Sequence, residues 1–195
     1  MTQWVILMGT VRRCRDDDRA AILGIVNAAA EAYRGVIPSD QWHEPYMPKA
    51  ELDKEIASGI MLWGYEENFT LIGVMGLQSV ADVDLIRHAY VLPSNQRRGI
   101  GGALLSHLRR LSTRRMLVGT WEAANWAIRF YQQRGFELVS PVQKNLLLRT
   151  YWDIPDRQIE TSVVLANPSL NEVTTRNSRH DHRFGTASEN RPTGR

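Results

Sequence analysis

The sequence predicts an α/β fold built around a mixed β-sheet. Residues 86–105 read as a strand, a glycine-rich turn and the start of a helix, and residues 116–121 form a nearly continuous apolar run, as in a strand buried on both faces. Residues 60–65 and 69–77 have the pattern of a hairpin. A strand–helix–strand unit places its two strands parallel, with a right-handed crossover. We therefore expect a central parallel pair in a mostly antiparallel sheet.

The composition is that of a single globular domain. The chain has 195 residues, of which 43% are hydrophobic, and a formal net charge of +3. No single element gathers the lysines and arginines, so we expect no nucleic-acid partner. Cys14 is the sole cysteine, which excludes a disulfide framework and a cysteine-rich zinc site, and we expect no metal. The apolar run at residues 4–8 is too short for a signal peptide or a membrane span. We expect a soluble cytoplasmic protein without a membrane partner.

The first third of the chain reads as a strand followed by two helices. Residues 10–14 favour the strand, and Asp16–Asp18 offer a cap and a favourable charge to a helix that runs to about Tyr33. Residues 48–58 favour a second, short helix. The loop between the two helices is long and unusually rich in aromatic side chains.

The rest of the chain alternates helices and strands. In chain order we expect a helix over residues 125–134 that ends at Gly135, a strand over 136–139, a helix over 141–152 and a last strand over 159–165. From residue 167 onward the chain has almost nothing to bury. We therefore predict one domain over residues 1–166 and a flexible polar tail over residues 167–195.

The turn at residues 96–102 has the chemistry of an anion site. Its glycines let the backbone bend sharply at the start of a helix, whose free N–H groups and positive dipole end attract phosphate. Arg97 and Arg98 add positive charge. The Walker A motif is excluded because Ala103 and Leu104 stand where it needs a lysine and a hydroxyl residue, and the order of the glycines excludes the dinucleotide fingerprint.

Two motifs together resemble the GNAT N-acetyltransferases. The first is Tyr90-Val91-x-Pro93 running into Gln96-Arg97-Arg98-Gly99-Ile100-Gly101, and the second is Asn125-x-Ala127-Ile128-Arg129-Phe130-Tyr131-x-x-x-Gly135-Phe136. The resemblance covers about residues 10–165. It implies the GNAT fold, with helices on both faces of the sheet, and an acyltransferase that moves an acetyl group from acetyl-CoA to a primary amine of a small molecule, peptide or protein. Family members often pair as homodimers, and a homodimer stays open for this chain.

The resemblance also implies roles for particular residues. The first motif is expected to bind the pyrophosphate of acetyl-CoA through Gln96, Arg97, Arg98, Gly99, Ile100, Gly101 and Gly102. The strand before it is expected to pair with the pantetheine arm through the backbone of Ala89, Tyr90 and Val91. In the second motif, Asn125 is expected to contact CoA and Tyr131 to protonate the departing thiolate. The spacing between Asn125 and Tyr131 is one residue shorter than is usual in the family.

The amine must be neutral to attack a thioester, so a base must take its proton. His88 is one candidate because an imidazole titrates in the right range, and strand alternation places it on one face with Ile86 and Tyr90. A structural, hydrogen-bonded histidine is the alternative. Glu122 and Glu44 are two further candidates, and ordered water is another.

The sequence leaves more than one interpretation of the acceptor pocket and of the function. We interpret Tyr33, Trp42 and Tyr46 as a wall of the acceptor pocket, and a satellite apolar cluster beneath the loop is the other interpretation. An aromatic wall suits an acceptor with an apolar part or a cation. A non-catalytic acyl-CoA sensor or partner-binding module is an alternative function, and acetylation of charged tRNA is a third, which salt-dependent RNA binding would support.

Overall fold

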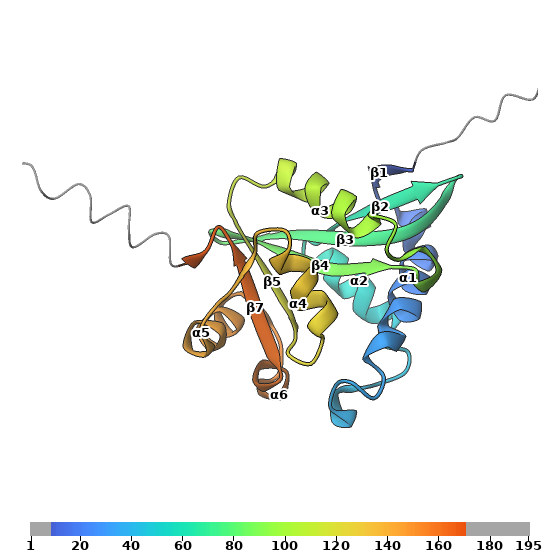
Figure 1. The fold of residues 1–195 in the computed structure, drawn as a ribbon. Helices are drawn as coiled ribbons and strands as arrows, with labels where there is room; N and C mark the ends of the chain where they lie inside the picture. The colour runs from blue at the N-terminus through green and yellow to red at the C-terminus, as the bar shows by residue number, and fades with distance from the viewer. Residues whose placement is uncertain (1–8, 171–195) are drawn as a thin grey trace, which may run out of the picture.

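The computed structural model describes residues 9–170; the apolar run at residues 4–8 and the tail from residue 171 onward lie outside them. Within the described range, the strands form one seven-stranded sheet in the order β1-β2-β3-β4-β5-β7-β6. Each neighbouring pair is antiparallel except β4 and β5, which are parallel. The predicted mixed sheet with a central parallel pair is thus confirmed (Figure 1).

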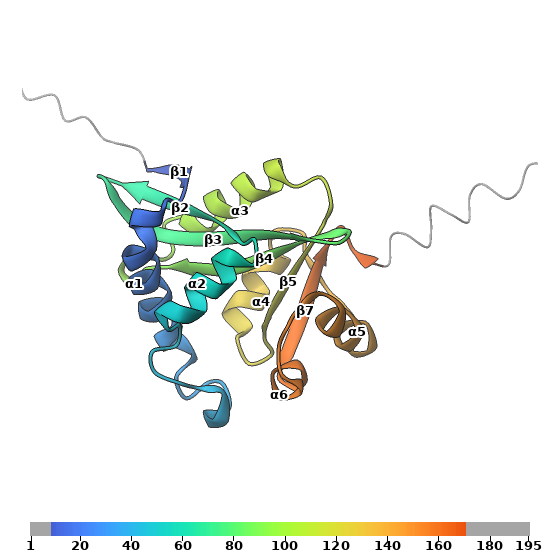
Figure 2. The same ribbon diagram turned by 180° about the vertical axis from the view of Figure 1, so that it is seen from behind.

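The first half of the chain supplies two helices and four strands. They are β1 (Thr10–Arg13), α1 (Arg19–Ala30), α2 (Lys49–Ala57), β2 (Met61–Glu67), β3 (Thr70–Val80) and β4 (Val83–Val91). Helix α1 buries a stripe at helical spacing that includes Ile22, Ile25 and Val26, and α2 adds Leu52. These side chains pack on β2 and β3, so α1 and α2 cover one face of the sheet (Figure 2).

The second half begins with the parallel unit and ends at the far edge of the sheet. Its elements are α3 (Ile100–Leu111), β5 (Arg115–Trp121), α4 (Asn125–Gln132), β6 (Glu137–Leu138), α5 (Pro141–Tyr151), α6 (Asp156–Glu160) and β7 (Ser162–Asn167). Helix α3 connects β4 to β5 and packs on the face opposite α1, together with α4. Helix α5 packs on the same face as α2, against β5 and β7. The expectation of helices on both faces is confirmed.

The predicted last strand was wrong at its start. Ile159 and Glu160 belong to α6, which follows Pro155 and opens with Asp156, and the strand begins at Ser162. Proline before an acidic first turn is a helix-start pattern. Because Ile159 is buried against β7 and α5, its apolar character serves the helix. The packed domain also extends a few residues beyond 166, since β7 includes Asn167 and the side chain of Ser169 is buried.

Strand β4 is irregular in its second half. Opposite β3, Arg87 pairs with Gly76 and Tyr90 pairs with Val74, so His88 and Ala89 together face one residue of β3. This is a β-bulge, and His88 adopts a left-handed backbone with φ of 48°. The parallel ladder with β5 ends at Ile86, which pairs with Val118. Beyond this point β4 and β5 diverge (Figure 1), which leaves one edge of β4 without a strand partner.

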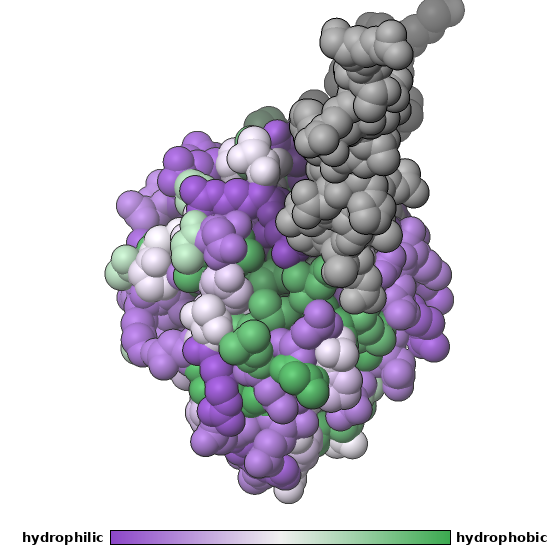
Figure 3. Space-filling view, turned by 90° about the vertical axis from the view of Figure 1, so that its left-hand side faces the viewer, coloured by the Kyte–Doolittle hydropathy of each residue, from purple (hydrophilic) through white to green (hydrophobic). Residues whose placement is uncertain are grey.

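Among residues 9–170, no helix has both the length and the apolar character that are needed to cross a membrane. Apolar side chains do gather on the face that carries α5 (Figure 3). The exposed apolar residues of α5 itself include Val142 and Leu146.

Candidate functional site

Two cavities lie on either side of the diverging strands. The first, here called the cofactor-side cavity, has a volume of about 540 Å³ and lies among the end of α1, the second half of β4, the start of α3 and α4. The second, here called the acceptor-side cavity, has a volume of about 470 Å³ and lies among the α1–α2 loop, α2, β4, β5 and the α5–α6 segment. Tyr33 and Tyr90 line both cavities. The site therefore has two compartments that meet at two tyrosines.

The start of α3 forms one end of the cofactor-side cavity. Gly99 precedes the helix with φ of 83°, a conformation that favours glycine. The first intrahelical bond runs from the Ala103 N–H to the Gly99 carbonyl, so the N–H groups of the preceding turn have no acceptor within the helix. A Cβ on Gly101 would approach the ring of Phe130 to 3.2 Å. The glycines thus keep a narrow, donor-rich cradle open.

Most of the predicted cofactor residues line this cavity. They are Ala89, Tyr90, Val91, Gln96, Arg97, Gly99, Ile100, Gly101 and Gly102. Gln96 also donates from its side-chain amide to the Val91 carbonyl at 3.2 Å, which ties the turn to the end of β4. Arg98 is not among the lining residues, and its guanidinium pairs with Glu67 at 2.8 Å. The structure therefore places Arg97 in the cradle and Arg98 beside it.

Helix α4 forms the other wall and carries Tyr131. This tyrosine is buried and lines the cofactor-side cavity. Burial raises the pKa of its phenol well above the ordinary value, with a smaller contribution from the nearby Tyr33, so Tyr131 holds its proton across the neutral range. Asn125, at the first position of α4, does not line the cavity, and its side-chain amide donates to the Ala123 carbonyl.

Arg134, just after α4, also reaches the cofactor-side cavity. Its guanidinium stacks on the Phe130 ring at 4.0 Å and donates to the Phe130 carbonyl at 2.9 Å. It reaches the first turn of α3, because a Cβ on Gly102 would lie 3.3 Å from Arg134 Nη2. Among the described residues it has no carboxylate partner. A cation held in this way beside free helix N–H groups adds to the attraction for phosphate.

The acceptor-side cavity has an aromatic wall from the α1–α2 loop. Tyr33 packs against Tyr46 at 5.6 Å, against Tyr90 at 6.5 Å and against Trp126 of α4 at 5.7 Å between ring centroids. Burial raises the pKa of Tyr33 to about 12. Tyr46 accepts a hydrogen bond from the indole N–H of Trp121 at 3.0 Å. Tyr33 and Tyr46 line the cavity.

Trp42 holds a different place in the same loop. It packs on Tyr46 at 5.6 Å and belongs to an apolar cluster around Ile37 and Trp121, but it does not line the acceptor-side cavity. The structure thus separates the three aromatic residues that the sequence grouped together. Two tyrosines form the wall, and Trp42 supports it from behind.

His88 lies in the acceptor-side cavity beside a carboxylate from another element. Its Nε2 contacts the Glu55 carboxylate, which also accepts from Arg87 at 2.9 Å. Burial pushes the pKa of Glu55 upward, but the hydrogen bonds and charges of His88 and Arg87 outweigh it, so the pKa of Glu55 is lowered. Glu55 is therefore ionised at neutral pH and orients the imidazole ring, which leaves the Nδ1 atom for other contacts.

The predicted face of β4 was wrong because of the bulge. Ile86 packs among α3 side chains, whereas Tyr90 packs on the cluster beneath α1 and α2. The bulge adds one residue between them, which reverses the alternation. His88 thus faces Glu55 of α2 and the acceptor-side cavity, together with Tyr90.

The other base candidates lie elsewhere. Glu122 is exposed and lines neither cavity. Glu44 is exposed and pairs with Arg34 at 2.9 Å. Of the side chains proposed from the sequence as the base, His88 is the one in the cavity.

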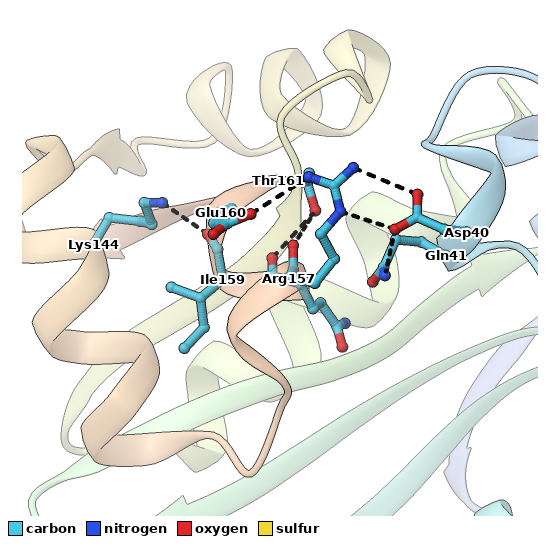
Figure 4. A network of polar contacts seen from close by, with 8 residues as sticks. Asp40, Gln41, Lys144, Arg157, Ile159, Glu160 and Thr161 are labelled. Carbon is cyan, nitrogen blue, oxygen red and sulfur yellow. Dashed lines mark hydrogen bonds and ion pairs between the residues drawn. The ribbon is translucent and has the colours of Figure 1, made fainter.

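An ion pair joins the two sides of the acceptor-side cavity. Arg157 of α6 donates from Nε to Asp40 of the α1–α2 loop at 2.9 Å (Figure 4). Asp40 lines the cavity, and so do Pro155 and Gln158 on the α6 side. The contact links segments that are 117 residues apart in the chain. The loop that carries Tyr46 is thus tied to the α6 side of the cavity.

The site contains no metal cluster or activated thiol within residues 9–170. No group of three or more metal-binding side chains is found there. Cys14 is half-buried against β2, away from both cavities, and burial raises the pKa of its thiol to about 12.

Comparison with known proteins agrees with this geometry. Residues 58–138 match the family model of the acetyltransferase (GNAT) domain. The chain is similar to the PaiA N-acetyltransferase of Thermoplasma acidophilum in complex with coenzyme A, with a TM-score of 0.63 and 17% identity over 82% of this chain and 98% of that chain.

Two further solved structures are similar. A GNAT-family acetyltransferase of Staphylococcus aureus Mu50 gives a TM-score of 0.62 and 14% identity over 82% of this chain and 98% of that chain. YncA of Salmonella typhimurium, a putative acetyltransferase with acetyl-CoA, gives a TM-score of 0.52 and 25% identity over 68% and 81%. No curated protein matches the sequence. The structural likenesses show the fold.

Proposed function

This chain has the GNAT fold and carries an acetyltransferase (GNAT) domain over residues 58–138, and from that premise we propose that it moves an acetyl group from acetyl-CoA to a primary amine by direct attack. The observation that carries the proposal is the pair of cavities that meet at Tyr33 and Tyr90. One cavity has an anion-binding helix start, and the other has a histidine–carboxylate pair. A donor and an acceptor held on the two sides can meet between the diverging strands.

The residues of the cofactor-side cavity fit CoA. The free N–H groups at the start of α3, with Arg97 and Arg134, supply donors for the pyrophosphate. The unpaired edge of β4 at residues 89–91 supplies backbone groups for the amides of the pantetheine arm. When bound, acetyl-CoA supplies the thioester that the amine attacks. We assign proton donation toward the sulfur to Tyr131, because its phenol lines the cofactor-side cavity and is protonated at neutral pH.

The residues of the acceptor-side cavity fit removal of a proton from the amine. Glu55 holds Nε2 of His88, so the neutral ring carries its proton there and offers Nδ1 as an acceptor. We assign stabilisation of the oxyanion to a backbone N–H at the edge of β4 that has no strand partner. Tyr33 and Tyr46 pack against each other and form one wall of the compartment. In this proposal His88 acts as the base and Glu55 orients it.

An assay of thiol release tests the proposal. The full chain is mixed with acetyl-CoA and a panel of primary amines, and free CoA thiol is followed together with the mass of each amine. We expect thiol release that depends on the amine, with one acetyl group gained by the amine. Binding of acetyl-CoA without release for any amine would contradict the enzyme and support the acyl-CoA sensor. Cytoplasmic location and the tRNA acceptor stay predictions from the sequence.

A further inference from the structure

The acceptor-side cavity has an excess of negative charge. Four carboxylates line it: Asp40, Glu51, Glu55 and Asp153. The lining residues include one arginine, Arg87. Its guanidinium already donates hydrogen bonds to Glu55 and to Gln78, at 2.9 Å each. No lysine lines this cavity. The described lining residues of this cavity therefore include more carboxylates than positively charged side chains.

Two of these carboxylates are occupied by partners and two are not. Asp40 pairs with Arg157, and Glu55 contacts Arg87 and His88. Among residues 9–170, the side chains of Glu51 and Asp153 form no ion pair or hydrogen bond. Both side chains are exposed to solvent, so each gains a modest, salt-dependent free energy from a nearby cation, and both act on a cation held in the same cavity.

The two free carboxylates belong to different walls. Glu51 is on α2, near the Tyr46 hydroxyl, and Asp153 is on the segment between α5 and α6. The lining also includes the aromatic residues Tyr46, Trp121 and Trp152. Aromatic faces attract cations and accept aliphatic carbon atoms equally well. The lining thus suits a slender apolar chain with a positive end.

We propose that the acceptor is a small amine that carries a second positive charge and no carboxylate. The reacting amine lies toward His88, Tyr90 and the thioester, and the second, protonated amine lies among Glu51, Asp153 and the aromatic rings. A free amino acid is disfavoured because its carboxylate meets unpaired carboxylates and an arginine that is already bonded. This inference rests on the proposed function and names its substrate class.

Three amines of equal chain length test the inference. They are 1,4-diaminobutane, 1-aminobutane and 4-aminobutanoate, whose far ends are positive, neutral and negative. With the full chain and saturating acetyl-CoA, we expect kcat/KM for the diamine to exceed that for 1-aminobutane by about 10-fold, with 4-aminobutanoate lowest. Added salt is expected to reduce the advantage of the diamine. Equal values for the diamine and the monoamine, or a higher value for 4-aminobutanoate, would overturn the inference.

Charge-neutral variants locate the effect. Glu51→Gln and Asp153→Asn are each expected to lower kcat/KM for the diamine about 5-fold and to leave 1-aminobutane nearly unchanged. Glu137→Gln and Asp17→Asn remove the same charges at exposed positions outside both cavities, and they should leave the ranking intact. If the control variants lower the ratio of kcat/KM for the diamine to kcat/KM for 1-aminobutane as much as the cavity variants do, the preference comes from the overall charge of the protein. The inference is then wrong.

Failure of the inference and failure of the proposed function give different results. Thiol release from the monoamine alone supports the enzyme and contradicts the diamine. If no amine releases thiol, the proposed function fails, and the inference then depends on calorimetric binding of the three amines to the CoA-saturated chain. Tighter binding of the diamine that Glu51→Gln weakens would support the charged pocket, and absence of such binding would contradict it.

Discussion

The imidazole of His88 lies against the carboxylate of Glu55, although the two residues come from a strand and a helix that are 33 residues apart in the chain. The bulge in β4 turns His88 toward α2, and Arg87 holds the same carboxylate from the other side. A carboxylate that fixes one ring nitrogen determines which nitrogen can act as a base. The catalytic geometry of the proposed site therefore depends on a backbone irregularity.

Replacement of Glu55 tests this arrangement. We expect Glu55→Gln to lower kcat about 10- to 100-fold, because the ring loses its orienting charge. The Kd for CoA, measured by calorimetry, is expected to stay unchanged, since Glu55 does not line the cofactor-side cavity. Asp53→Asn is the matched control: it removes a paired carboxylate from the same helix, outside both cavities. A similar loss of kcat in the control would assign the effect to the stability of α2.

Tyr131 is the proposed proton donor, and removal of its hydroxyl should separate binding from turnover. Tyr131→Phe keeps the buried ring among Phe130 and Phe136, which pack on it at 5.0 and 5.5 Å. We expect CoA binding near the wild-type value and a loss of kcat of about 100-fold, the usual effect of a lost general acid. Equal turnover in both proteins would remove Tyr131 from the mechanism.

Arg134 and Arg98 offer a matched pair at the cofactor side. Arg134 lines the cradle without a carboxylate partner among the described residues, whereas Arg98 is bonded to Glu67. We therefore expect Arg134→Gln to raise the KM for acetyl-CoA about 10-fold, as when a charged hydrogen bond to phosphate is lost. Arg98→Gln is expected to change this KM less than 2-fold. Initial rates at varied acetyl-CoA concentration give the two KM values. A larger increase of KM in Arg98→Gln than in Arg134→Gln would show that Arg98 leaves Glu67 to bind the donor.

The two motifs together were enough to predict the fold, and they place the proposed donor side in one part of it. Gly99 and its neighbours carry their function in local backbone geometry, and a turn before a helix can be recognised from residue types alone. Such local conformations depend on neighbouring residues, so they can be predicted from the sequence without knowledge of the tertiary contacts. The role of Tyr131 came from the resemblance of the motif at residues 125–136 to the second motif of the GNAT N-acetyltransferases, and it stays a prediction.

The acceptor side depends on contacts that no local pattern contains. The alternation of side chains between the two faces of β4 breaks at His88. The bulge there depends on pairing with β3 and cannot be recognised from the sequence of β4 alone. Glu55 looked like any polar residue of a short helix until the fold brought it to His88. Asp40 and Arg157 meet across the cavity for the same reason. Pro155 with Asp156, by contrast, was a readable helix start that the apolar Ile159 concealed.

The N-terminal strand provides a last prediction, on stability. Arg12 donates to Asp18 at 2.7 and 3.0 Å and to Glu66 at 2.7 Å, which joins β1 to the start of α1 and to β2. The hydrogen bond from Arg12 outweighs burial and lowers the pKa of Asp18 to about 2. A lowered pKa in the folded state stabilises the protein above the unfolded value of 3.8, and this contribution is lost as the pH falls through 2.

We therefore expect Asp18→Asn to lower the free energy of unfolding by about 1–2 kcal/mol at pH 7, after allowance for the partial exposure of the pair. At pH 2 the variant and the wild type should differ much less, because Asp18 is then about half protonated in the folded state and almost fully protonated in the unfolded state. Urea titrations at both pH values measure the difference. Asp17→Asn, the exposed neighbour, controls for the loss of charge near α1. A deficit of equal size at both pH values would show that Asp18 acts through packing or backbone hydrogen bonds and that its charge contributes little.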